Sequence, residues 1–137
     1  MIPEADRLAG ESTAKVRAVT ETLYDALVDL GCTAYVKTIY IDFEHGGELV
    51  AAMYPYGQRV EIALALPEDY ANPLLIDATH LTWKTMPVAA VVRTATDAKQ
   101  VLPMLREAFE RVTSGQHDVE LPNERFIRDS NYRRRQR

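Results

Sequence analysis

The chain has only one cysteine, Cys32, among its 137 residues, so it cannot form an internal disulfide. A chain of this length falls in the size range of one domain and buries enough surface to fold without cross-links. Long hydrophobic runs are also absent: the longest, such as "IALAL", have the length of a strand, whereas a membrane-spanning helix needs about 20 apolar residues. The acidic start of the chain, interrupted by Pro3, does not resemble a secretory signal. We therefore expect a cytoplasmic protein with no membrane segment.

The sequence also lacks the spacing patterns of common metal and phosphate sites. Its three histidines, His45, His80 and His117, are far apart in segments expected to be loops, and they lack zinc-ligand spacing. The segment "HGGE" contains two glycines but not the Lys-Ser/Thr that completes a phosphate-binding loop. These motifs therefore predict no metal ion and no cofactor.

One pair of carboxylates keeps a catalytic hypothesis open. Asp42 and Glu61 could meet across adjacent strands, where paired carboxylates can bind Mg²⁺ or share a proton. A restriction-type nuclease site would also need a Glu-x-Lys sequence, but Ala63 stands where the lysine would be. A metal-dependent hydrolase or nuclease is therefore the third of three functional hypotheses.

The charge of the chain is divided unevenly. Residues 1–123 carry 10 basic and 18 acidic side chains, whereas residues 124–137 carry 6 basic and 2 acidic ones. The body of the protein would repel nucleic acid at long range, and the end of the chain would attract it. We therefore expect a single domain over residues 1–123 and a basic tail over residues 124–137.

The tail provides candidate binding residues. Its arginines can form charge-assisted hydrogen bonds to phosphates, and its tyrosine can stack on a base. Alternatively, the tail is a solubilising extension, or it pairs with the acidic body of a neighbouring subunit. The candidates are Arg128, Tyr132, Arg133, Arg134, Arg135 and Arg137.

Periodicity predicts the order of helices and strands. Apolar residues recur at three- and four-residue steps over residues 12–31, which predicts a helix capped by Ser12 or Thr13 and ended by Gly31. Alternating residues then predict three antiparallel strands, "TAYVKTIYIDFEH", "ELVAAMY" and "RVEIALALP", joined by glycine-containing turns.

The second half of the chain completes the expected sheet. Residues 67–87 contain three prolines and no clear period, which predicts a long connection with at most a short helix. "VAAVVRTA" predicts a fourth strand, and a closing helix follows, capped by Thr94 or Thr96. The expected fold is α+β, in the order α-β-β-β-β-α, with about four antiparallel strands and both helices packed on one face.

These segments resemble a small family of bacterial domains without an assigned activity, sometimes labelled predicted transport proteins. The resemblance covers about residues 12–113 and rests on "VKTIYIDF", "ELVAAMY", "RVEIALALP" and the segment from Asp77 to Phe109. It departs from the pattern at "THLTW", where a turn containing glycine and histidine is expected, and the basic tail lies outside it. The resemblance implies an α+β fold and no catalytic residues. The matching positions are Lys37, Tyr40, Leu66, Pro67, Asp77, Thr96, Asp97, Ala108 and Phe109.

The sheet face away from the helices is the second candidate site. Its small residues, such as Ala63 and Ala65, are unusual on strands and would let another surface approach closely. This predicts either a dimer interface or a shallow ligand groove walled by Tyr40, Tyr54 and Trp83. The alternative is that the connection over residues 67–87 folds across this face. The candidate residues are Lys37, Tyr40, Asp42, Glu61 and Trp83.

Lys37 and Tyr40 are three residues apart on the expected strand, so they should point to opposite faces and not form one site. The first functional hypothesis is a non-enzymatic, homo-oligomeric interaction domain that binds a protein partner or a small ligand through the sheet face or the tail. The second is a nucleic-acid-binding accessory protein that uses the tail arginines.

Overall fold

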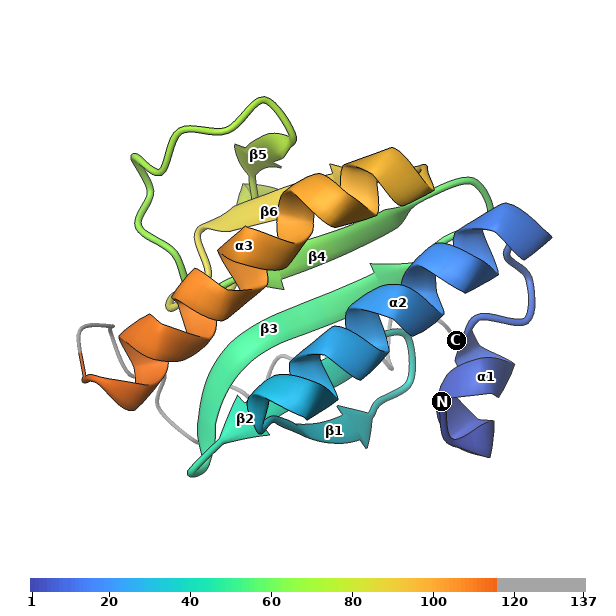
Figure 1. Cartoon of the computed structure of the whole chain (residues 1–137), viewed down its shortest axis with the longest axis horizontal. Coiled ribbons are helices and arrows are strands. Elements are labelled where there is room, and N and C mark those ends of the chain that lie inside the picture. Colours follow the sequence, from blue (N-terminus) through green and yellow to red (C-terminus); the bar gives the residue numbers. More distant parts are fainter. Residues whose placement is uncertain (116–137) are drawn as a thin grey trace.

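The computed structural model describes residues 1–115, which form a six-stranded antiparallel sheet with two long helices across one of its faces (Figure 1). The strand order across the sheet is β1-β2-β3-β4-β6-β5. The strands are β1 (Thr33–Val36), β2 (Ile41–His45), β3 (Glu48–Pro55), β4 (Val60–Leu64), β5 (Leu75–Asp77) and β6 (Val88–Val92). The helices are α1 (Pro3–Leu8), α2 (Ala14–Leu30) and α3 (Ala95–Thr113), with a 3₁₀ turn η1 at Thr79–Leu81.

Side-chain caps and one glycine define the ends of the long helices. Thr13 Oγ1 accepts a hydrogen bond from Val16 N at 3.3 Å, and Thr94 Oγ1 accepts one from Asp97 N at 3.0 Å. Gly31 ends α2 with a φ of +118°, a conformation that costs glycine little. Of the capping residues that the sequence offered as alternatives, Thr13 caps α2 and Thr94 caps α3.

The expected α+β class and antiparallel sheet are confirmed, but the expected four strands are wrong. The alternating segment before residue 46 is two strands rather than one, because the chain turns where Lys37 N donates to Tyr40 O at 2.8 Å. The connection contributes another strand, β5, which pairs with β6. Residues expected to be an irregular lead-in form α1, which begins at Pro3 and is joined to α2 by an ion pair between Asp6 and Arg17.

The core lies between the sheet and the two long helices, which run side by side across it in Figure 1. Tyr24 of α2 packs edge-on against Phe43 of β2, with ring centroids 5.6 Å apart. Along the sheet, successive cross-strand partners on the Phe43 face are fully buried. These partners are Ile41, Met53, Ile62 and Ala90. The face that carries Phe43 is therefore the one that the helices cover.

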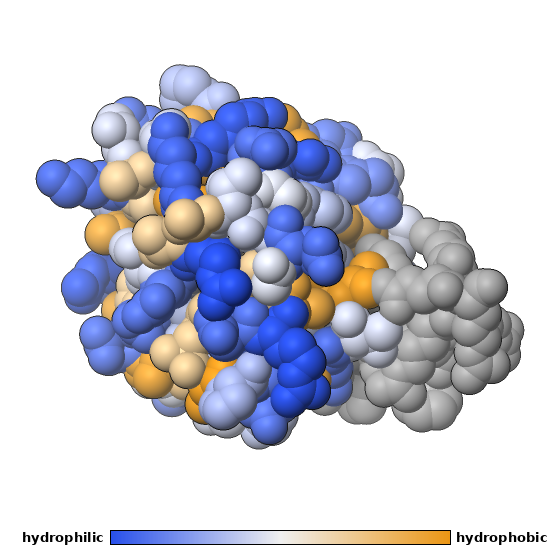
Figure 2. All heavy atoms as spheres, turned by 90° about the vertical axis from the view of Figure 1, so that its right-hand side faces the viewer, coloured by the Kyte–Doolittle hydropathy of each residue, from blue (hydrophilic) through white to orange (hydrophobic). Residues whose placement is uncertain are grey.

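The surface of the domain is mostly hydrophilic at the end where α1 lies. Figure 2 shows this end with charged and polar side chains dominating and apolar side chains in small, separate groups. Within residues 1–115, no helix combines the length and apolar character needed to cross a membrane.

Candidate functional site

The sheet face opposite α2 and α3 holds most of the residues that the sequence singled out. We call it the back face and define it by Tyr40, Asp42, Ala52, Tyr54, Glu61, Ala63 and Ala89. Asp42, Ala52, Ala63 and Ala89 are successive cross-strand partners on β2, β3, β4 and β6. They alternate with the helix-facing residues of the same strands, so their side chains point away from the helices.

Of the two alternatives that the sequence left open for the back face, an exposed surface and a covered one, the structure fits the covered one. All residues of β4 and all but the two ends of β3 are buried, so both faces of these central strands are covered. A near-continuous apolar run such as "LVAAMY" is typical of a strand buried on both faces. The small alanine side chains therefore allow close packing over the sheet.

Three aromatic residues form a packed cluster on the back face. The ring of Tyr40 lies 5.1 Å from that of Tyr54 and 5.6 Å from that of Trp83, measured between centroids. Trp83 Nε1 donates a hydrogen bond to the Tyr54 hydroxyl at 2.8 Å. Trp83 belongs to the segment between η1 and β6, so part of the connection does fold over this face. The cluster that the sequence predicted exists, but its rings contact one another instead of walling a groove.

Carboxylates lie beside this cluster. Asp42 has no exposed surface, and Glu44, two residues further along β2, is 8% exposed. Glu61 is also buried; its carboxylate lies 3.4 Å from His80 Nε2 and 3.9 Å from the Arg59 guanidinium. A carboxylate that is fully removed from water requires cationic or hydrogen-bonding partners, so each of these buried carboxylates must be accompanied by such groups.

A residue that the sequence did not single out completes this region. Tyr35 on β1 is the cross-strand partner of Asp42, and its side chain is 47% exposed. If residues 33–45 were one unbroken strand, as the alternation predicts, Tyr35 and Phe43 would share the face opposite Asp42. The turn after Val36 reverses that assignment and brings an accessible aromatic ring beside Asp42.

The paired-carboxylate hypothesis does not fit this geometry. Asp42 and Glu61 are not on adjacent strands, because β3 lies between β2 and β4. Two strand spacings separate them by about 10 Å across the sheet, whereas two oxygens bound to one Mg²⁺ lie within about 4 Å of each other. Within residues 1–115, no group of three or more histidine, cysteine or acidic side chains is arranged to hold a metal ion.

Lys37 lies apart from the aromatic cluster. It lines a cavity of about 390 Å³ with Val36, Thr38 and residues of α1, namely Glu4, Arg7 and Leu8. The expectation that Lys37 and Tyr40 do not share one site is compatible with this arrangement, although a turn rather than strand alternation separates them. The tail candidates, from Arg128 to Arg137, lie outside the described residues.

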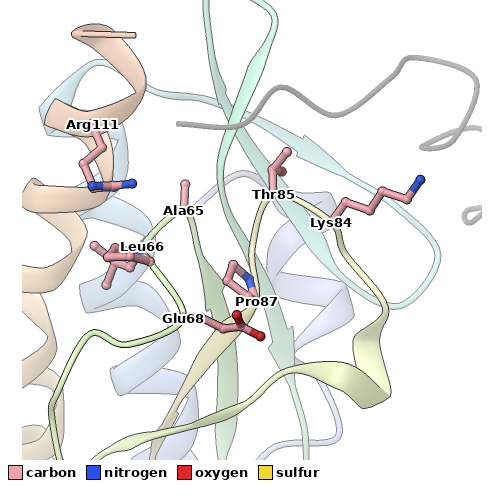
Figure 3. Close-up of a pocket in the computed structure, with 8 residues that line it drawn as sticks. Ala65, Leu66, Glu68, Lys84, Thr85, Pro87 and Arg111 are labelled. Carbon is pink, nitrogen blue, oxygen red and sulfur yellow. The ribbon is translucent and has the colours of Figure 1, made fainter. Parts of the chain in front are cut away.

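A second pocket was missed by the sequence analysis. It has a volume of about 350 Å³ and lies between α3, the turn after β4 and the turn before β6 (Figure 3). Arg111 reaches toward it from α3, Glu68 lies beside Pro87, and the Lys84 side chain extends outward. Three separate segments contribute its lining, so no local motif could have revealed it. Its mixture of charges suits a small polar molecule.

Comparisons with known proteins do not identify the chain: no family model, no curated protein and no solved structure matches it. The resemblance to the bacterial family therefore stays a prediction.

Proposed function

We propose that this protein is a non-enzymatic binding domain that takes up a cationic segment of a protein partner on its back face. The observation that carries the proposal is the position of Asp42: a carboxylate with no exposed surface, on a sheet face that also holds Tyr40, Tyr54 and Trp83. Arginine matches such a site, because a guanidinium forms paired hydrogen bonds with a carboxylate and stacks on aromatic rings.

The arrangement of β1 and β2 favours an extended partner segment. Asp42 and Glu44 lie on the same side of β2, about 7 Å apart along the strand. Alternate side chains of an extended peptide have the same spacing, so two cationic residues at positions i and i+2 would match the two carboxylates. The exposed ring of Tyr35 beside Asp42 offers the first point of contact.

Because Asp42 is buried, a partner's guanidinium has to replace the group that accompanies this carboxylate in the free protein. The proposal therefore describes an exchange of cationic or donor groups at Asp42 rather than entry into an empty cavity. This requirement favours arginine over lysine, since a guanidinium is less strongly hydrated than an ammonium group and is easier to bury.

Peptide titration tests the proposal on the full-length chain. The five arginines from Arg128 to Arg137 are replaced by glutamine, so that an added hexa-arginine peptide supplies the competing guanidinium groups. Trp83 is the only tryptophan in the chain, and its contacts with Tyr40 and Tyr54 make its fluorescence a reporter of the back face. We expect saturable binding that Asp42→Asn weakens at least about tenfold.

The matched control is Asp25→Asn, which removes one carboxylate from the exposed side of α2. It should leave the affinity unchanged. Equal weakening by both substitutions, or no saturable binding to the glutamine variant, would contradict the proposal.

The second hypothesis, binding of nucleic acid through the arginines of residues 124–137, predicts a different result. Wild-type protein would retain single-stranded DNA or RNA, and this retention would fall steeply with salt and vanish in the five-glutamine variant. The acidic side chains of the back face would take no part, so Asp42→Asn would leave the retention unchanged.

A further inference from the structure

We infer that the pocket between α3, the turn after β4 and the turn before β6 binds a small zwitterion, namely an α-amino acid with an apolar side chain. The inference goes beyond the proposed function, because none of the residues that define the back face is among those that line this pocket within residues 1–115. Three observations carry it: a buried hydroxyl without a partner, opposite charges on separate segments, and walls that hydrogen bonds hold in place.

Thr85 supplies a buried polar group to the pocket. The residue is 7% exposed, and its Oγ1 forms no hydrogen bond with any other group in residues 1–115. A buried hydroxyl has lost its hydrogen bonds to water, and this loss costs free energy unless another polar group replaces them. Because Thr85 lines the pocket, the carboxylate of a bound molecule can accept a hydrogen bond from this hydroxyl.

Two side chains of opposite charge line the pocket from different segments (Figure 3). Arg111 is half-buried and reaches toward the pocket from the last turn of α3, whereas Glu68 is exposed in the connection after β4. A guanidinium has five N–H donors in a planar fork, so it can bind a carboxylate with paired hydrogen bonds and still serve other acceptors. The carboxylate of Glu68 would attract an ammonium group. An α-amino acid carries both complementary groups.

Hydrogen bonds between distant segments hold the walls of the pocket in place. Ala78 N, just after β5, donates to Pro87 O at 2.9 Å, which fixes the turn before β6. The Tyr70 hydroxyl donates to Glu107 Oε2 at 2.9 Å, which joins the connection after β4 to α3. The pocket is therefore formed before a ligand arrives, so binding does not have to order its walls.

The size of the pocket and its apolar lining limit the side chain of the ligand. The volume of about 350 Å³ is near the lower end of the range for ligand pockets. A short, branched aliphatic side chain such as that of valine suits this space. The apolar part of the lining comes from Ala65, Leu66, Pro67 and Pro87.

The same charges make phosphate a poorer ligand. Lys84 also lines the pocket, but its side chain extends outward (Figure 3). The carboxylate of Glu68 would repel a doubly charged anion, whereas it would attract the ammonium group of an amino acid. The arrangement therefore favours a molecule without net charge over a multivalent anion.

Calorimetric titration of the full-length chain with L-valine tests the inference. Two analogues each lack one charged group: 3-methylbutanoate has no ammonium group, and 2-methylpropylamine has no carboxylate. We expect saturable binding of L-valine and at least about tenfold weaker binding of each analogue, because each leaves one charged side chain of the pocket without its partner. These comparisons use the wild-type chain, so they remain informative if a variant does not fold.

Two pairs of variants locate the carboxylate of the ligand. Thr85→Val removes the hydroxyl at nearly constant shape and should weaken L-valine binding about tenfold, whereas Thr85→Ser keeps a hydroxyl and should bind as wild type does. Arg111→Gln should weaken binding by a similar factor. Its control is Arg106→Gln, which removes an exposed arginine of α3 that lines a different hollow, and it should leave the affinity unchanged.

A third pair locates the ammonium group. Glu68→Gln should weaken the binding of L-valine but not that of 3-methylbutanoate, because only L-valine has an ammonium group. The control Asp69→Asn removes the neighbouring exposed carboxylate and should change neither affinity.

Three results would overturn the inference. The first is the absence of saturable L-valine binding to the wild-type chain. The second is equal or tighter binding of 3-methylbutanoate or inorganic phosphate, which would indicate a site for anions rather than for zwitterions. The third is an unchanged affinity for L-valine in both Thr85→Val and Arg111→Gln, which would place the binding outside this pocket. None of these results affects the proposed function of the back face.

Discussion

At the scale of single residues, two buried threonines differ in whether their hydroxyl groups form a hydrogen bond. Thr20 has no exposed surface, and its hydroxyl donates to Val16 O at 2.9 Å within α2. Thr85 is also buried, but its Oγ1 has no hydrogen-bond partner in the part of the chain that the structure describes. A buried hydroxyl without a partner costs free energy, because it loses its hydrogen bonds to water.

This contrast predicts opposite effects of one substitution at two sites. Thr85→Val removes an unsatisfied hydroxyl at nearly constant shape, so it should raise the free energy of unfolding by about 1 kcal/mol. Thr20→Val loses a hydrogen bond and should lower it by about 1 kcal/mol. Urea denaturation of the two variants measures both changes. A loss of stability in Thr85→Val would show that its hydroxyl does have a partner.

At the scale of elements, the helix ends were the most predictable features. Thr94 caps α3 and Asp97 accepts a hydrogen bond from Arg93 N at 3.0 Å, so the two side chains satisfy donors at the start of the helix from both directions. Gly31 was identified because few residues adopt the left-handed conformation that ends α2. These signals are local, so the sequence alone carries them.

The capping geometry predicts different outcomes for two neighbouring threonines. Thr94→Ala should lower the free energy of unfolding by about 1 kcal/mol, because Asp97 N loses its acceptor. Thr96→Ala should have little effect, since Thr96 is exposed in the first turn and makes no capping hydrogen bond. Thermal unfolding of both variants, followed by circular dichroism, makes the comparison. A larger loss of stability in Thr96→Ala than in Thr94→Ala would contradict the assignment of Thr94 as the cap.

The elements that the sequence did not predict depend on distant contacts. The turn between β1 and β2, "KTIY", contains no glycine, proline or asparagine, so alternation continues through it in the sequence although the chain reverses. β5 has only three residues, and its pairing with β6 determines that it is a strand. The contact of Trp83 with Tyr40 follows from that pairing, because η1 and the residues after it start from the end of β5.

The candidate site was predicted in part for the same reason. Alternation correctly placed Asp42 on the face opposite Phe43. Tyr40, Tyr54 and Trp83 were expected to lie near one another and do, but as a packed cluster instead of the walls of a groove. It could not place Tyr35 beside Asp42 or separate Asp42 from Glu61 by a strand, because both facts depend on the strand order.

At the scale of the whole molecule, ionisation of the Cys32 thiol makes the stability of the fold depend on pH. It follows the end of α2, is 6% exposed, and burial raises the pKa of its thiol from about 9 to about 12. The folded state therefore favours the neutral thiol. Its contribution to stability is complete below pH 9, the range of an unfolded cysteine, and is lost as the pH rises from 9 toward 12.

This shift predicts that the folded protein protects its thiol. At pH 8 the thiolate population is about a thousandfold lower than in the unfolded chain, so reaction with a disulfide reagent should be slow and should accelerate in step with denaturant-induced unfolding. Cys32→Ala should reduce the loss of stability between pH 9 and pH 12, measured against wild type. Rapid labelling of native protein at pH 8 would contradict the burial.

Both borders of the sheet are short, with four residues in β1 and three in β5. Brief border strands offer few unpaired backbone groups to a neighbouring molecule and so limit aggregation by strand addition. The protection at the β5 side depends on very few hydrogen bonds. Loss of β5 would uncover β6, whose sequence "VAAVV" has no charge, proline or glycine and is typical of segments that form intermolecular sheets. Conditions that detach β5 should therefore convert the folded protein into a seed for fibrous assembly.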